Sequence, residues 1–159
     1  MADRKTWLFK SEPTAYSFAD LLNEPDQTAE WDGVRNYQVR NFMRDEMKVG
    51  DGVLFYHSST NPTGVVGTAT IVREAYPDPT AWDPQSKYYD ARSSPDNPAW
   101  LMVDIKADQE FSRLVTLQEI KQNPRLEDML LVKRGVRLSI QPVTREEWDE
   151  IVSMGNRSR

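Results

Sequence analysis

Short apolar runs separated by turn-forming residues predict several β-strands in this chain. The runs are rich in β-branched and aromatic residues, which favour strands. They cover residues 6–10, 53–57, 65–72, 100–106 and 137–143. In the last run, Leu138 and Ile140 alternate with Ser139 and Gln141, which indicates one apolar and one polar face.

Helix signals lie between these strands. Ser17 suits an N-cap for a short helix over 18–23, and the spacing of apolar positions predicts a helix over 38–47. Two Thr-x-x-Glu capping boxes, at Thr116 and Thr144, predict helices that start at Leu117 and Arg145. The strands and short helices show no regular βαβ alternation, so we expect a mixed β-barrel with helices outside, in one domain over 1–159.

The segment 76–98 does not fit either pattern. It contains five prolines, which exclude a long helix, and we expect an ordered loop. The loop also contains Trp82, Tyr88 and Tyr89, which a solvated linker would rarely carry.

Composition narrows the possible functions. The chain has no cysteine and one histidine, which excludes disulfides and thiolate nucleophiles and argues against zinc sites, so no metal or cofactor is expected. The net charge of −5 argues against nonspecific coating of nucleic acid, although a small basic rim stays open. There is no signal-peptide pattern and no membrane-spanning apolar run, so we expect a cytoplasmic protein, or a nuclear one in a eukaryote.

The segment Trp31-Asp-Gly-Val-Arg-Asn-Tyr37 contains the most informative chemistry. Two aromatic residues flank a glycine, an arginine and an amide, a combination that can stack on a nucleobase and hydrogen-bond its edge. The alternative is that Trp31 and Tyr37 are ordinary core aromatics beside a turn. These residues taken alone favour the alternative.

Other candidate sites are weaker. A hydrolytic His57–Ser58 pair is disfavoured, because strand neighbours point to opposite faces. The glycines of Gly64-Val-Val-Gly67 indicate tight packing or a bulge rather than a backbone-binding loop. Candidates for a phosphate rim, with a solvated helix face as the alternative for the middle two, are Arg35, Arg40, Arg44 and Lys48.

Taken together, an ordered set of motifs resembles the EVE-domain family over nearly the whole chain. Beside the 31–37 segment, the motifs begin at Lys10, Met47, Phe55, Gly64, Ala75, Tyr88, Trp100 and Arg137: KSEP, MKVGD, FYHS, GVVG, AYPDP, YYD, WLMVD and RLSIQP. The resemblance implies a PUA-like α+β fold, a curved and mostly antiparallel β-barrel surrounded by helices. It also implies binding of modified bases, with modified cytosine in DNA favoured over RNA.

By motif match, the resemblance implies a base pocket that includes a strand end, the 31–37 segment and loop aromatics. Its residues are Lys10, Ser11, Trp31, Asn36, Tyr37, Tyr56, His57, Ser58, Trp82, Tyr89, Ser139 and Gln141. Which loop aromatic completes the pocket is left open. In this hypothesis a 5-methyl- or 5-hydroxymethylcytosine flips out of DNA and stacks on Trp31, without catalysis. The alternatives are a modified-RNA binder and an amidohydrolase like one in the related ASCH domains.

Overall fold

The computed structural model describes residues 4–156 and contains one mixed sheet of six strands. The strands are β1 (Thr6–Ser11), β2 (Thr28–Trp31), β3 (Gly52–His57), β4 (Gly64–Pro77), β5 (Leu101–Thr116) and β6 (Ile140–Val143). Their order across the sheet is β2-β5-β4-β3-β1-β6. Strands β1 and β3 run parallel, and the other neighbouring pairs are antiparallel.

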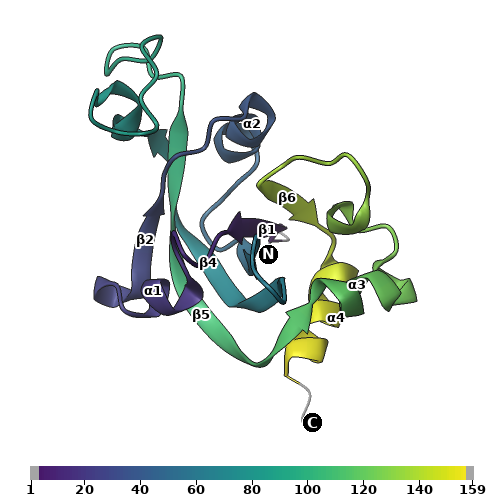
Figure 1. The fold of residues 1–159 in the computed structure, drawn as a ribbon. Coiled ribbons are helices and arrows are strands. Elements are labelled where there is room, and N and C mark those ends of the chain that lie inside the picture. Colours follow the sequence, from purple (N-terminus) through teal and green to yellow (C-terminus); the bar gives the residue numbers. More distant parts are fainter. Residues whose placement is uncertain (1–3, 157–159) are drawn as a thin grey trace.

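The sheet curls strongly, so that β6 lies beside β1 in the middle of the molecule and β2 lies at the far edge (Figure 1). Within residues 4–156, the two end strands β2 and β6 are not hydrogen-bonded to each other, so the curled sheet is not a closed barrel. The predicted α+β class and the mostly antiparallel curved sheet are confirmed.

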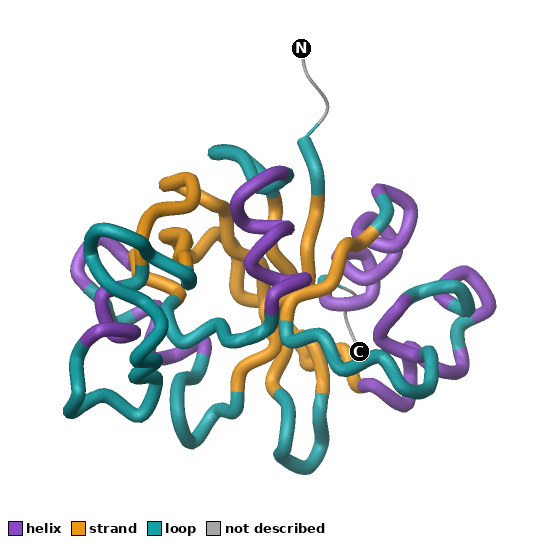
Figure 2. Tube along the Cα trace, turned by 90° about the horizontal axis from the view of Figure 1, so that it is seen from above, coloured by secondary structure: helices purple, strands orange, loops and turns teal. Residues whose placement is uncertain are grey.

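Helices and loops surround the strands when the molecule is seen from above (Figure 2). The helices are α1 (Phe18–Leu22), α2 (Tyr37–Asp45), α3 (Leu117–Gln122) and α4 (Arg145–Gly155), with short 3₁₀ turns at Pro25–Gln27, Pro79–Trp82, Pro124–Leu126 and Leu130–Val132. Capping boxes begin α1, α3 and α4, which confirms the two helix starts that the Thr-x-x-Glu motifs predict. No helix within 4–156 is long and apolar enough to cross a membrane.

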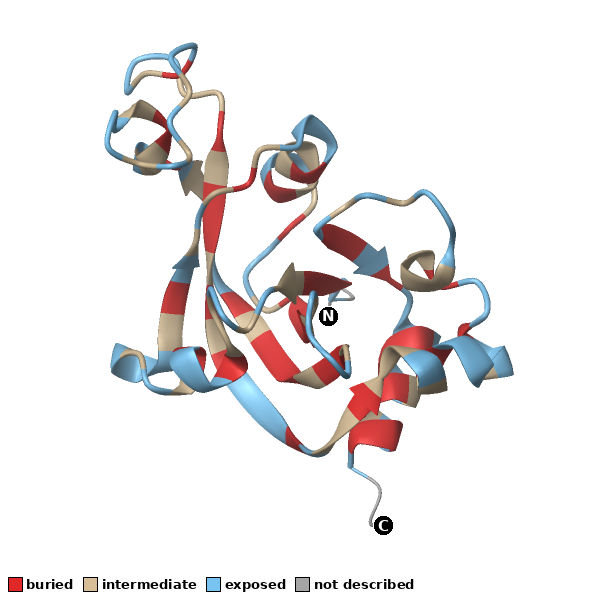
Figure 3. Cartoon of the chain, in the orientation of Figure 1, coloured by how far each residue is buried: buried red, intermediate tan, exposed pale blue. Residues whose placement is uncertain are grey.

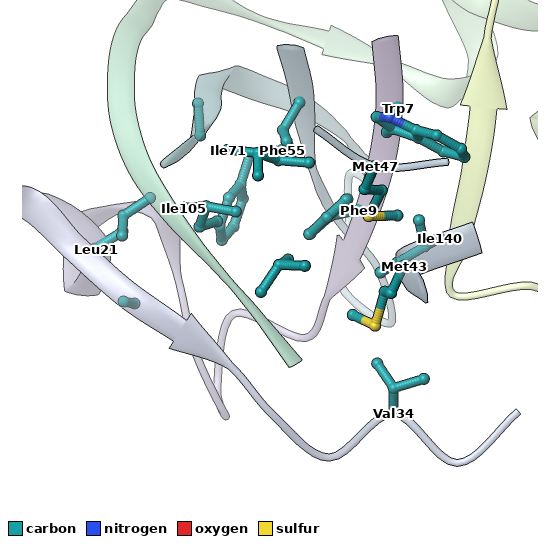
Figure 4. Close-up of a cluster of buried hydrophobic side chains, with 14 of the residues drawn as sticks. Trp7, Phe9, Leu21, Val34, Met43, Met47, Phe55, Ile71, Ile105 and Ile140 are labelled. Atoms are coloured by element: carbon teal, nitrogen blue, oxygen red, sulfur yellow. The ribbon is translucent and has the colours of Figure 1, made fainter. Parts of the chain in front are cut away.

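Alternation along the strands divides the buried residues between two clusters. On β3, Phe55 belongs to the first cluster, whereas Leu54 and Tyr56 belong to the second. The first cluster packs under α2 and contains the labelled side chains of Figure 4. The second packs against α4 through Trp148 and Ile151. Figure 3 shows that buried residues follow the strands and the inner faces of the helices.

Strands β4 and β5 pair to form a long two-stranded ribbon. They span Gly64–Pro77 and Leu101–Thr116 and extend well beyond the predicted strands. Their pairing shifts register between Val65 and Gly67, which confirms the irregularity that the two glycines predict. At one end the ribbon holds residues 78–100, here named the 78–100 loop, which lies beside α2 (Figure 1).

Candidate functional site

A cavity of about 990 Å³ opens where the ends of β1 and β2 meet the 78–100 loop and the segment before β6. This volume is at the upper end of the range of about 300–1,000 Å³ that is typical of ligand pockets. Its lining residues come from all of these elements: Lys10, Ser11, Glu12, Ala15, Tyr16, Glu24, Thr28, Ala29, Glu30, Trp31, Asp32, Gly33, Val34, Arg35, Ser58, Lys87, Tyr88, Arg137, Leu138 and Ser139.

Trp31 lines this cavity from the last position of β2, where it pairs with Val103 of β5. Its ring packs against Phe9 and Phe55, with ring centroids 5.3 and 5.6 Å away, and against Tyr16 edge-on at 6.2 Å. Trp31 is therefore a half-buried residue with one side in the core. Trp31 thus packs in the core and also lines the cavity, and its stacking on a base stays a prediction.

The end of β1 contributes the Lys10 ammonium group to the cavity, and backbone hydrogen bonds hold this strand end in place. The Lys10 N–H donates to the Ser139 carbonyl at 2.8 Å, and the Ser58 N–H donates to the Ser11 carbonyl at 2.9 Å. These bonds hold Lys10, Ser11, Ser58 and Ser139 around one side of the cavity. Burial lowers the pKa of the Lys10 ammonium. The Ser11 hydroxyl is already used, because it donates to the Tyr16 carbonyl.

Tyr88 lines the cavity from the 78–100 loop, and Gly33 holds its position. Gly33 has a φ of +80°, and a Cβ built there would lie 2.6 Å from Cζ of Tyr88. Only glycine fits, both for the backbone conformation and for the close approach of the ring. Tyr88 therefore lies directly against the backbone that follows Trp31.

Arg35 and Asp78 fasten this loop to the 31–37 segment. Arg35 Nε and Nη2 donate to the Tyr88 carbonyl at 2.9 and 2.6 Å, and Nη1 donates to Asp78 Oδ2 at 3.1 Å. The fully buried Asp78 also accepts from the Gly33 N–H at 2.9 Å. Burial would raise the pKa of Asp78, but hydrogen bonds from Thr80, Gly33 and Arg35 lower it, so the carboxylate stays ionised.

The remaining charges around the cavity are of both signs. The exposed cations are Lys87, in the 78–100 loop, and Arg137, in the segment before β6, and the carboxylates are Glu12, Glu24, Glu30 and Asp32. Glu24 accepts a hydrogen bond from the Tyr16 hydroxyl at 2.9 Å. Burial, followed by the nearby carboxylates of Asp78 and Glu30, raises the pKa of Asp32.

Six of the residues predicted for the pocket or its rim line the cavity: Lys10, Ser11, Trp31, Arg35, Ser58 and Ser139. Arg35 differs from a free rim cation, because its guanidinium already makes five hydrogen bonds within the protein. Its contact with a phosphate stays a prediction.

The other predicted pocket residues lie outside this lining, and the contacts of five of them are clear. Asn36 caps α2 by accepting from the Val39 N–H, and Tyr37 stacks on Trp100 with ring centroids 4.6 Å apart. His57 Nε2 accepts from the Phe18 N–H at 3.1 Å. Tyr56 is buried in the second cluster, and the buried Gln141 amide donates to the Leu138 carbonyl. The loop aromatics Trp82 and Tyr89 also lie outside the cavity lining. Trp82 is half-buried and Tyr89 is exposed.

The predicted rim cations Arg40, Arg44 and Lys48 also lie outside the lining. Arg40 donates to the Ala99 carbonyl, Arg44 pairs with Asp45, and Lys48 is 3.9 Å from Glu74. Several other residues that were not predicted for the pocket or its rim also line the cavity, among them Tyr16, Asp32, Lys87, Tyr88 and Arg137. Asp32, Tyr88 and Arg137 lie within the family motifs and Lys87 directly precedes one, but no spacing rule identifies which side chains face inward.

Comparisons with known proteins give consistent results. The chain is 42% identical to human thymocyte nuclear protein 1, covering 93% of this chain and 72% of that protein, and 43% identical to the chicken (Gallus gallus) protein, covering 93% and 67%. Among solved structures, a Pseudomonas syringae protein matches with 46% identity and a TM-score of 0.88, covering 94% of this chain and 98% of that one. The structure of human THYN1 protein in complex with DNA containing 5-methylcytosine matches with 41% identity and a TM-score of 0.90, covering 98% and 99%. The EVE domain model matches residues 5–154, and the chain therefore belongs to the EVE domain family.

Proposed function

We propose that this protein binds a modified cytosine that is flipped out of DNA into the cavity lined by Trp31 and Tyr88. The observation that carries the proposal is Trp31 itself, a large flat ring held firmly by the core with part of its surface in the cavity. The related human THYN1 protein forms a complex with DNA that contains 5-methylcytosine.

The energies are compatible with this mode of binding. Flipping a base costs a few kcal/mol, and stacking on aromatic residues returns about 1–3 kcal/mol per base. Trp31 and Tyr88 supply two aromatic surfaces, and each is fixed in place before a ligand arrives. Fixed side chains reduce the entropy lost on binding.

We further propose that Lys87 and Arg137 contact the phosphates beside the flipped nucleotide, because both are exposed and line the cavity. Two contacts would give a shallow dependence of affinity on salt, with a slope near −1.8 for duplex DNA at about −0.9 per phosphate. Phosphate contacts by Arg40, Arg44 and Lys48 stay a prediction. A rim of that size would give a much steeper slope.

The test compares Tyr88→Leu with Tyr89→Leu in titrations of fluorescent oligonucleotides that carry cytosine or 5-methylcytosine at one position. Tyr88→Leu should weaken binding of the methylated strand by about 5- to 150-fold, the loss of one stacking contact. Tyr89→Leu tests the neighbouring aromatic, which lies outside the lining. A loss confined to Tyr89→Leu would move the aromatic wall to that residue. If wild type binds no modified-cytosine strand, the proposed function is wrong.

We propose a binding module rather than an enzyme, acting in the cytoplasm of a bacterial cell or the nucleus of a eukaryotic one. The alternative enzyme would use Lys10 and Glu12 at the cavity to hydrolyse a modified cytidine. Incubation with acylated cytidine separates the two, since a binding module gives no turnover. Matched DNA and RNA strands then test the preference for DNA, because the 2′-hydroxyl distinguishes them.

A further inference from the structure

A binding site for 5-methylcytosine in DNA has to reject thymine. Thymine carries the same methyl group at C5 and stacks in the same way, and it is present throughout DNA. The two bases differ at the edge: cytosine presents an amino group at C4, and thymine presents a carbonyl oxygen there. Stacking on Trp31 or Tyr88 does not sense that difference, so a hydrogen-bonding group in the cavity must do so.

Four carboxylates line the cavity, and our candidate for this role is Asp32, just past the end of β2. It follows Trp31 directly in the chain and lines the same cavity. Within residues 4–156, no side chain is hydrogen-bonded to the Asp32 carboxylate or forms an ion pair with it, whereas the neighbouring Glu24 already accepts from Tyr16. Asp32 therefore has free acceptor capacity beside the stacking surface.

We propose that the Asp32 carboxylate accepts a hydrogen bond from the 4-amino group of the bound cytosine and thereby excludes thymine. This inference rests on the proposed function and names the edge that the site recognises. The Lys10 ammonium, on the β1 side of the same cavity, is the donor for the acceptor atoms O2 and N3 of cytosine. Carboxylate and ammonium together match the donor–acceptor–acceptor edge of cytosine. With thymine, the carboxylate would meet the O4 oxygen, and two acceptors repel each other.

The electrostatic environment supports this assignment. Burial and the nearby carboxylates of Asp78 and Glu30 raise the pKa of Asp32, and burial lowers the pKa of Lys10. Asp32 is exposed by surface area and Lys10 is half-buried, so each group is partly desolvated where it lines the cavity. A cytosine edge supplies a donor to the carboxylate and acceptors to the ammonium, so binding compensates both groups. A base with the wrong edge leaves them uncompensated, which is the usual source of strong discrimination.

The experiment measures the affinities of wild type and Asp32→Asn for strands that differ at one position only. The position carries 5-methylcytosine, thymine or 5-methyl-2-pyrimidinone, which lacks the 4-amino group. Wild type should prefer 5-methylcytosine over thymine by about 5- to 150-fold, the discrimination given by a good edge contact. Asp32→Asn should lose most of this ratio, because the amide N–H₂ can donate to thymine O4.

Two controls make the outcome decisive. Asp96→Asn removes an equal charge from an exposed position outside the cavity lining and should keep the wild-type ratio. Replacing 5-methylcytosine with 5-methyl-2-pyrimidinone should weaken binding to wild type more than to Asp32→Asn, because the amide oxygen of Asn is a weaker acceptor than a carboxylate. If Asp32→Asn binds 5-methylcytosine and keeps the wild-type ratio over thymine, Asp32 does not read the amine. A wild type that binds no modified cytosine overturns the proposed function instead.

Discussion

Gly33→Ala is the sharpest test of how the site is built, because two other glycines provide matched comparisons. Gly33 and Gly135 both have a φ of +80°, but a Cβ at Gly33 meets the Tyr88 ring, whereas a Cβ at Gly135 meets nothing within 4 Å. A positive φ costs an alanine about 1–2 kcal/mol, partly offset by about 0.4–1 kcal/mol from the stiffer unfolded chain. Gly135→Ala should therefore lower the free energy of unfolding by about 0.5–1 kcal/mol.

Gly33→Ala should cost about 1–3 kcal/mol more than Gly135→Ala, because the methyl group must push the Tyr88 ring away or distort the backbone. Urea denaturation of the two variants at pH 7 measures this difference from the midpoints and slopes. The displaced ring should also weaken binding of a 5-methylcytosine strand by about 5- to 150-fold. Gly50→Ala, which has a φ of +97° and open space around the Cβ, controls for backbone strain outside the cavity.

Two results would refute the reasoning. Equal losses of stability in Gly33→Ala and Gly135→Ala would show that the Tyr88 ring does not lie against Gly33 in solution. A destabilised Gly33→Ala that binds the modified strand as tightly as Gly50→Ala would show that Tyr88 is in place but is not a wall of the base site. The first result would therefore contradict the packing of Tyr88, and the second would contradict its role in binding.

Two further predictions concern titratable groups. The hydrogen bond from Arg113, at 2.8 Å, lowers the pKa of Glu119 from 4.5 to about 2. This stabilisation is fully present above pH 4.5 and is lost as the pH falls through 2, so Glu119→Gln should cost about 1 kcal/mol in urea at pH 7 and much less at pH 2. His57 is the single histidine, and burial lowers its pKa below 6.5, so its NMR titration should have a midpoint below that value. Because the unfolded chain binds the proton more readily, His57 should also cost stability as the pH falls below 6.5, and His57→Gln should remove that slope. A midpoint at or above 6.5 would contradict the buried neutral imidazole that accepts from the Phe18 N–H.

Much of the fold could be predicted because its signals are local. The capping boxes at Thr116 and Thr144 begin α3 and α4 at the predicted residues, since a cap depends on three or four neighbouring positions. The full length of β5 could not be predicted. The middle of this strand contains exposed residues 108–110, and it is a strand because it pairs with β4, which is a long-range contact.

The candidate site could be predicted in part for the same reason. Strand alternation predicts correctly that the side chains of His57 and Ser58 point in different directions. The same alternation places Tyr56 in the second cluster, outside the cavity lining. The 78–100 loop has no periodicity that shows whether Tyr88 or Tyr89 lines the cavity. Tyr88 lines it because its ring lies against Gly33 and Arg35 donates to its carbonyl. Those partners are more than fifty residues away in sequence, so no local pattern reveals them.

The buried Asp78 has a kinetic consequence. Its bonds to Gly33 and Arg35 connect the 31–37 segment to the 78–100 loop before any ligand is present. The residues that line the cavity therefore do not have to become ordered when a base binds, and different bases should associate at similar rates. Residence time, rather than the speed of capture, should then distinguish a preferred modified base from its competitors. A scan along DNA would reject most bases by quick release.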